Sequence, residues 1–148
     1  MSVRTVFLGR LIGFYCILVG LAYAARKEAV LTAVTRLIHD PAIMLVLGAV
    51  ILAAGLAMVL AHNNWSGGAM PAVVTLIGWI SIAKGLFFLA LSPEAMVSLL
   101  DALHYARLFY MYVALDVLIG IYLVLAAARA EKSAFRDGAA VEVVLQRM

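Results

Sequence analysis

The chain has 148 residues, of which 67% are hydrophobic and 13% charged, and its formal net charge is +3. Soluble domains are about 45 to 50% apolar, so this composition excludes a soluble globular domain and indicates an integral membrane protein. The small net charge gives no sign of nucleic-acid binding. The single cysteine, Cys16, excludes an intramolecular disulfide.

Four apolar stretches are long enough to cross a bilayer. A transmembrane helix needs roughly 20 mainly apolar residues, and the qualifying stretches are residues 6–25, 41–61, 70–91 and 108–128. Only short connectors and a tail at 129–148 remain, which is too little for a second domain. We therefore expect one all-α transmembrane domain over residues 1–148, folded as a four-helix bundle.

The first and third stretches share a sequence pattern. Residues 11–21 and 76–86, 65 positions apart, match at both leucines, both glycines and two isoleucines. The same shift carries Gly48 and Gly55 of the second stretch onto Val113 and Gly120 of the fourth. We interpret this as an internal repeat of residues 8–61 and 73–126. Each unit crosses the membrane twice, so the copies are expected to be parallel repeats about an axis along the membrane normal.

The two connectors within the repeats are patterned rather than loose. Residues 26–40 place apolar side chains at helical spacing, at Val30, Val34, Leu37 and Ile38. Asp40-Pro41 then ends this segment, because a residue before proline avoids the helical region. The run Ser92-Pro93-Glu94 supplies a cap and a first turn for a similar apolar segment. Both connectors are predicted to be interfacial helices, on one face of the membrane.

Orientation follows from the lysines and arginines near the helix ends. Five lie near the face that holds both termini, Arg4, Arg10, Arg129, Lys132 and Arg136, against four on the connector face, Arg26, Lys27, Arg36 and Arg107. This balance places both termini, with the tail at 129–148, in the cytoplasm of a bacterium and the protein in its inner membrane.

Helix packing is expected to run through paired glycines. Small residues let membrane helices approach closely, and residues seven apart lie on one helix face. The glycines in this pattern are Gly13, Gly20, Gly48, Gly55, Gly78, Gly85 and Gly120. We interpret them as packing positions rather than as the lining of a pore.

Lys84 and Asp116 are the ionisable residues deep within the apolar stretches. Lys84 lies nine residues before Pro93 and Asp116 nine after Arg107, so both are expected roughly 13 Å inside the same face. Charges within membrane helices usually face the bundle interior and find a partner. The pattern predicts a buried charge pair, which either fixes helix register or serves as a proton or ion site.

His39 and His104 correspond under the 65-residue shift and form a second candidate. Two histidines on one face are an arrangement that a haem or metal can use, but no CxxCH or HExxH spacing accompanies them. We therefore predict no metal site and no catalytic residues, and keep haem or quinone binding only as an alternative. Tyr105 and Tyr110, like Trp65 in the central turn, are expected interface anchors. His62 is interpreted as a turn histidine facing the headgroups.

The chain also shows a resemblance. The run His62-Asn63-Asn64-Trp65, followed by residues 75–79 (TLIGW) and Lys84-Gly85, is similar to that of small uncharacterised four-helix inner-membrane proteins of bacteria. The four-helix, repeat-containing layout is distantly similar to DoxX-like membrane proteins. The resemblance implies a fold and a location but no activity.

Three functions fit these patterns. Small size and the absence of any catalytic motif favour a non-enzymatic accessory or scaffold subunit, whose partners are the bilayer and other membrane subunits or further copies of the chain. An oligomeric ion, proton or small-molecule carrier using Lys84 and Asp116 is the first alternative. A haem- or quinone-binding redox protein is the second.

Overall fold

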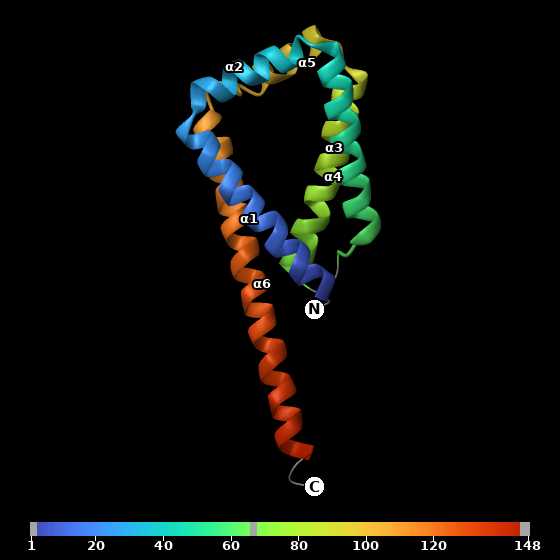
Figure 1. Ribbon diagram of the computed structural model, residues 1–148, viewed down its shortest axis with the longest axis vertical. Coiled ribbons are helices and arrows are strands. Elements are labelled where there is room, and N and C mark those ends of the chain that lie inside the picture. The colour runs from blue at the N-terminus through green and yellow to red at the C-terminus, as the bar shows by residue number, and fades with distance from the viewer. Residues whose placement is uncertain (1–2, 66–67, 146–148) are drawn as a thin grey trace.

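The computed structural model describes residues 3–65 and 68–145, and the side chains of residues 5–65 and 68–133. Over these residues the chain is all-helical, which confirms the all-α part of the predicted fold class (Figure 1). The elements in order are α1 (Val3–Ala25), α2 (Lys27–Ile38), α3 (Pro41–Ala61), α4 (Ala69–Ala90), α5 (Pro93–Ala102) and α6 (Phe109–Leu145).

Four helices contain a segment long and apolar enough to cross a membrane. These segments are Thr5–Ala25, Pro41–Ala61, Ala69–Ala90 and Phe109–Ser133. The first three agree with the expected stretches to within one residue at each end. A multi-pass membrane protein is thus the class that the helices support.

The predicted helix starts at α3 and α5 are confirmed. The Asp40 side chain caps α3 by accepting hydrogen bonds from the backbone N–H groups of Ala42 at 3.0 Å and Ile43 at 3.1 Å. The Ser92 hydroxyl accepts one from the Ala95 N–H at 3.3 Å at the start of α5. A proline follows each cap at the first helical position, where its missing N–H costs nothing.

Helix α6 is longer than the fourth apolar stretch of the sequence. Helix α6 does not end near residue 128 but continues to Leu145, and its C-terminal part projects past the other helices (Figure 1). The residues that end the apolar run, among them Arg129, Glu131 and Lys132, are good helix formers, so polarity changes there without a helix stop. The side chains of the predicted apolar run, Val141 and residues 143–145, lie outside the part of the chain whose side chains are described.

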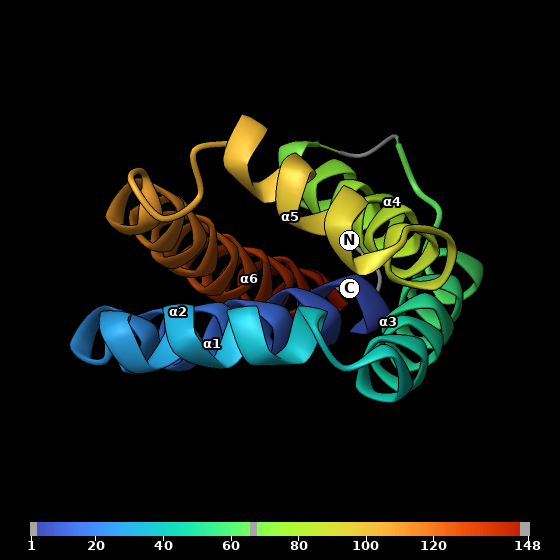
Figure 2. The same cartoon turned by 90° about the horizontal axis from the view of Figure 1, so that it is seen from above.

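The long helices form two antiparallel pairs, α1 with α6 and α3 with α4. Figure 1 shows the pairs close together at the end where α1 begins and apart at the other end, where α2 and α5 both cross from one pair to the other. Figure 2, seen from above, shows these two connecting helices side by side over the same end. The four helices are therefore arranged as two splayed pairs rather than as an evenly packed bundle.

Apolar clusters lie at both ends of the long helices, and the cluster near the termini joins the two pairs. Near the termini, Met70 and Val74 of α4 pack with Leu123 and Ala127 of α6, and α1 adds Ile12. At the connector end, Ile38, Met44 and Met96 join α2, α3 and α5. Between these clusters the contact between the pairs is slight.

The seven glycines of the sequence pattern are all buried within the two helix pairs. A Cβ on Gly13 would lie 2.8 Å from the Gly120 carbonyl oxygen across α1 and α6, and one on Gly55 would lie 3.1 Å from the Gly78 carbonyl oxygen across α3 and α4. A Cβ added to any of the remaining glycines of the pattern would lie within 2.5 to 3.0 Å of the partner helix; these are Gly20, Gly48 and Gly85.

Candidate functional site

Polar side chains gather on the faces that the two helix pairs turn toward each other. On α4, Ile77 belongs to the cluster near the termini and Phe88 to the connector-end cluster. Lys84 lies seven residues after Ile77 and four before Phe88, so it falls on the same stripe of the helix. Lys84 therefore faces the region between the pairs, where its side chain is exposed.

Asp116 approaches the same region from α6. It precedes the cluster residues Ile119 and Leu123 by three and seven positions, and is half-buried. One carboxyl oxygen is 3.5 Å from the Cβ position of Gly20 on α1. Asp116 and, from α4, Lys84 are both close enough to act electrostatically on the thiol of Cys16 on α1.

The predicted buried pair of Lys84 and Asp116 is not formed as an ion pair. Within the residues whose side chains are described, the recorded ion pair joins Arg10 of α1 to Glu131 of α6, and Lys84 is exposed rather than buried. The reason is the splay, because α4 and α6 contact each other only slightly. Both charges lie near Cys16, a neighbour of Asp116 that the sequence analysis did not identify.

His39 and His104 occupy different local structures. His39 directly follows α2 in a right-handed conformation, and its Nδ1 lies 2.8 Å from the Thr35 carbonyl oxygen. His104 lies in the turn between α5 and α6 with a φ of 50°, a left-handed conformation, and its Nδ1 is 3.0 Å from the Ala102 carbonyl oxygen. Both side chains are exposed. In the part of the chain that the structure describes, no three His, Cys, Asp or Glu side chains come together as a metal-binding group.

A cavity of about 190 Å³ separates α2 from α5 beside His39. Val34 and Ile38 line it from α2, and Val97 and Leu100 line it from α5. His39 and Asp101 stand at its polar edge. This volume is below the 300 to 1,000 Å³ of typical ligand pockets, so the cavity by itself is too small for a haem.

The expected interface residues lie at the helix ends. Trp65 is 60% exposed and donates from its indole N–H to the Asn63 side-chain oxygen at 3.0 Å. Tyr105 stacks on Tyr112 with ring centroids 5.9 Å apart, and burial together with the nearby Tyr23 raises the pKa of Tyr105. The Lys27 ammonium lies 5.3 Å from the centroid of the Tyr110 ring, a cation–π contact at the junction of α1, α2 and α6.

His62 does not face the headgroups as expected. It is only 6% exposed at the end of α3, and its Nε2 has no hydrogen-bond partner within the described residues. The buried Thr75 hydroxyl lies 3.2 Å from the His62 carbonyl oxygen and accepts a hydrogen bond from the Asn64 N–H at 3.1 Å. Thr75 thus fixes the turn after α3. In the sequence, the only sign of this contact is a threonine near the start of an apolar helix.

Among the described side chains, the region between the helix pairs therefore holds a cysteine (Cys16), a lysine (Lys84) and a carboxyl group (Asp116). Comparison of the chain with models of known protein families, with curated proteins and with solved structures finds no match.

Proposed function

We propose that this protein is a non-enzymatic accessory or scaffold subunit of a bacterial inner-membrane complex, with both termini in the cytoplasm. The observation that carries the proposal is the length of α6. Its membrane segment is Phe109–Ser133, yet the helix continues to Leu145, about three further turns.

The projecting part of α6 is the proposed docking arm. It extends past the other helices (Figure 1), and a short helix that gains nothing from tertiary packing is only marginally stable in water. A partner that packs along residues 134–145 would stabilise this part of the helix. Lys84 is a second proposed contact with a neighbouring subunit. Its exposed ammonium group lies within a membrane span, where an acidic side chain of that subunit would neutralise its charge.

The experiment compares the full chain with a chain that ends after Ser133. Both are extracted from native membranes in a mild detergent, and particle mass is measured by light scattering after size exclusion. The full chain is expected in a particle larger than the monomer and the shortened chain as the monomer. A chain with residues 134–148 in scrambled order is the matched control. Extraction of the full chain as a monomer would contradict the proposal.

We also propose that the two halves are parallel repeats. Under the 65-residue shift, the Gly13–Gly120 contact between α1 and α6 corresponds to the Gly78–Gly55 contact between α4 and α3. The same shift relates the glycine pair Gly48 and Gly85 to Val113 and Gly20, which also face each other. These matched contacts support a two-fold relation in which each pair takes one helix from each half.

A carrier function is the second candidate, because Lys84, Asp116 and Cys16 share the region between the pairs. Proteoliposomes with an internal pH-sensitive dye test it. A carrier predicts a proton flux that Lys84→Met and Asp116→Asn each abolish, whereas Lys27→Met, outside the four membrane segments, retains it. An unchanged dye signal from the full protein would reject this candidate.

A further inference from the structure

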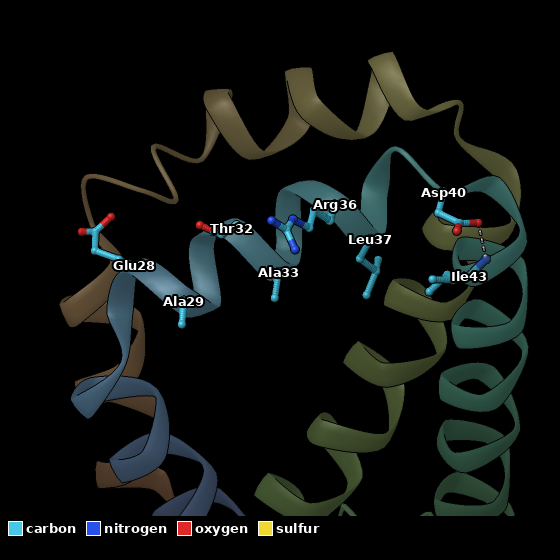
Figure 3. A pocket seen from close by; sticks show the side chains of 8 residues that line it. All are labelled: Glu28, Ala29, Thr32, Ala33, Arg36, Leu37, Asp40 and Ile43. Atoms are coloured by element: carbon cyan, nitrogen blue, oxygen red, sulfur yellow. Dashed lines mark hydrogen bonds between the residues drawn. The ribbon is translucent and has the colours of Figure 1, made fainter.

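A groove of about 700 Å³ lies beneath α2, on the side of that helix away from α5. Figure 3 shows the side chains of Ala29, Ala33 and Leu37 pointing from α2 into the opening below it, with Ile43 of α3 at one end. Its volume lies within the roughly 300 to 1,000 Å³ of sites that hold small molecules. The small alanines leave this room, since larger side chains there would fill it.

The rim of the groove carries one available cation. Arg36 is exposed and lines the groove, and the ion pairs recorded among the described side chains do not include it. The Asp40 carboxylate, one turn further along, accepts the two backbone hydrogen bonds that cap α3. Glu28 lies eight residues before Arg36, about 12 Å along the helix. The guanidinium is therefore free to bind an anion at the groove.

The position of α2 identifies the class of anion. The helix joins the ends of two membrane-spanning helices, α1 and α3, so in a bilayer it lies in the headgroup plane with its lower face toward the acyl chains. An arginine at that level meets lipid phosphates, which its planar fork can bind through two N–H groups. The apolar groove below it meets the chains of the same lipid.

We propose that this groove is a binding site for one phospholipid, with its phosphate on Arg36 and an acyl chain beneath Ala29, Ala33 and Leu37. The proposal rests on the membrane placement of the helices and not on the accessory or carrier role. Two features of the ligand are required together, the phosphate group and the apolar chain.

Two variants separate these requirements. Arg36→Gln removes the cation, and Ala33→Leu fills the groove with a larger apolar side chain. Arg107→Gln is the matched control for charge, because Arg107 is an exposed arginine on the same face that does not line the groove. Ala57→Leu is the control for size, because Ala57 is an exposed alanine on α3 far from the groove. All four positions are exposed, and circular dichroism verifies that each variant keeps its helix content.

The measurement is native mass spectrometry of the full chain in a delipidating detergent, titrated with phosphatidylglycerol, diacylglycerol or inorganic phosphate. One phosphatidylglycerol is expected to bind per chain, with little binding of the other two. Arg36→Gln is expected to weaken phosphatidylglycerol binding about tenfold, which corresponds to the loss of one charge-assisted hydrogen bond. Ala33→Leu is expected to weaken this binding at least as much. The two controls are expected to bind as the unchanged protein does.

Three results would overturn the proposal. Equal binding of diacylglycerol would show that Arg36 is not used, and equal binding of inorganic phosphate would show that the groove is not used. Equal weakening by Arg107→Gln would show only a general attraction of the basic face to anionic lipid. Because the titration uses isolated chains, its result is independent of whether α6 docks onto another subunit.

Discussion

Gly13 on α1 and Gly120 on α6 lie against each other so closely that a Cβ on Gly120 would stand 2.7 Å from the Gly13 carbonyl oxygen. Real Cβ atoms do not approach backbone oxygen at that distance. The two helices touch through their backbones here, and no side-chain movement can make room for a larger residue at either position. Close backbone contact of this kind is how membrane helices associate without a hydrophobic driving force.

Gly120→Ala is therefore expected to destabilise the α1–α6 pair. Alanine gains about 1 kcal/mol of helix propensity over glycine, but forcing a methyl group into a well-packed contact costs typically 1 to 3 kcal/mol, and here the obstacle is backbone. We expect a net loss of stability, measured by thermal unfolding in detergent.

Gly9→Ala is the control for this substitution. The atom nearest to a Cβ on Gly9 is the terminal methyl of Met70, the far end of a flexible side chain. Met70 can turn away, so the propensity gain should remain and stability should change little or rise. If Gly9→Ala and Gly120→Ala lower the unfolding temperature equally, the backbone contact is not what distinguishes the α1–α6 pair.

Lys84 and Asp116 are expected to be energetically coupled although they form no ion pair. Both act on the Cys16 thiol, and a charge at a helix centre costs about 2.5 to 3.5 kcal/mol on insertion scales. Lys84→Met or Asp116→Leu alone leaves the other group without an opposite charge nearby. The double substitution should then lose less stability than the sum of the single losses, as a double-mutant cycle in detergent measures. Additive losses would mean that the two groups do not share one region.

The helix starts were predictable because single residues set them. Asp40-Pro41 and Ser92-Pro93 combine a capping side chain with a proline that fits only a first turn, and both helices begin there. The apolar runs likewise predicted the spans, since about 20 apolar residues have few alternatives to a membrane helix. These are local properties of the chain.

The arrangement of the candidate site was not predictable in the same way. The exposure of Lys84 depends on the splay of two helix pairs, which is set by which apolar clusters form at each end rather than by the sequence near Lys84. The burial of His62 depends on Thr75, thirteen residues away, holding the turn after α3. Repeat periodicity indicates which helices are equivalent, but it does not give the angle between the pairs.

His104 is expected to be tolerant of asparagine and intolerant of valine. Its φ of 50° is left-handed, a conformation that asparagine adopts readily and that costs other L-residues about 1 to 2 kcal/mol. His104→Asn should change stability by only a few tenths of a kcal/mol, and His104→Val should cost about 1 to 2 kcal/mol or more. Chemical unfolding in a mild detergent measures both.

The same two substitutions at His39 are the control, since its φ of −82° is right-handed and valine carries no such penalty there. The experiment also tests the haem alternative. If His104 were a ligand, His104→Asn would abolish a Soret band in protein purified from native membranes while leaving stability unchanged in the absence of haem. A loss of stability with asparagine equal to that with valine would contradict the conformational account of His104.

Glu94 is expected to make stability fall in acid. Its carboxylate accepts a hydrogen bond from its own backbone N–H and a second from Ser92, and the nearby His39 adds electrostatic attraction. Together these lower the pKa of Glu94 below its ordinary value of 4.5. A carboxyl group whose pKa is depressed in the folded protein stabilises it at pH values above the unfolded pKa, and this contribution is lost as the pH falls through the folded pKa. The unfolding temperature should therefore decline from about pH 5 downward.

Two variants identify Glu94 as the source of that decline. Glu94→Gln lacks the titrating group, so its unfolding temperature should be lower than that of the unchanged protein near neutral pH and should approach it in acid. Ser92→Gly removes one hydrogen bond to the carboxylate and should bring the pKa of Glu94 closer to its ordinary value, which shrinks the acid-dependent loss. Thermal unfolding followed by circular dichroism in detergent, at several pH values between about 3 and 7, measures all three proteins. A Glu94→Gln protein that loses stability in acid as steeply as the unchanged protein would assign the decline to other carboxyl groups.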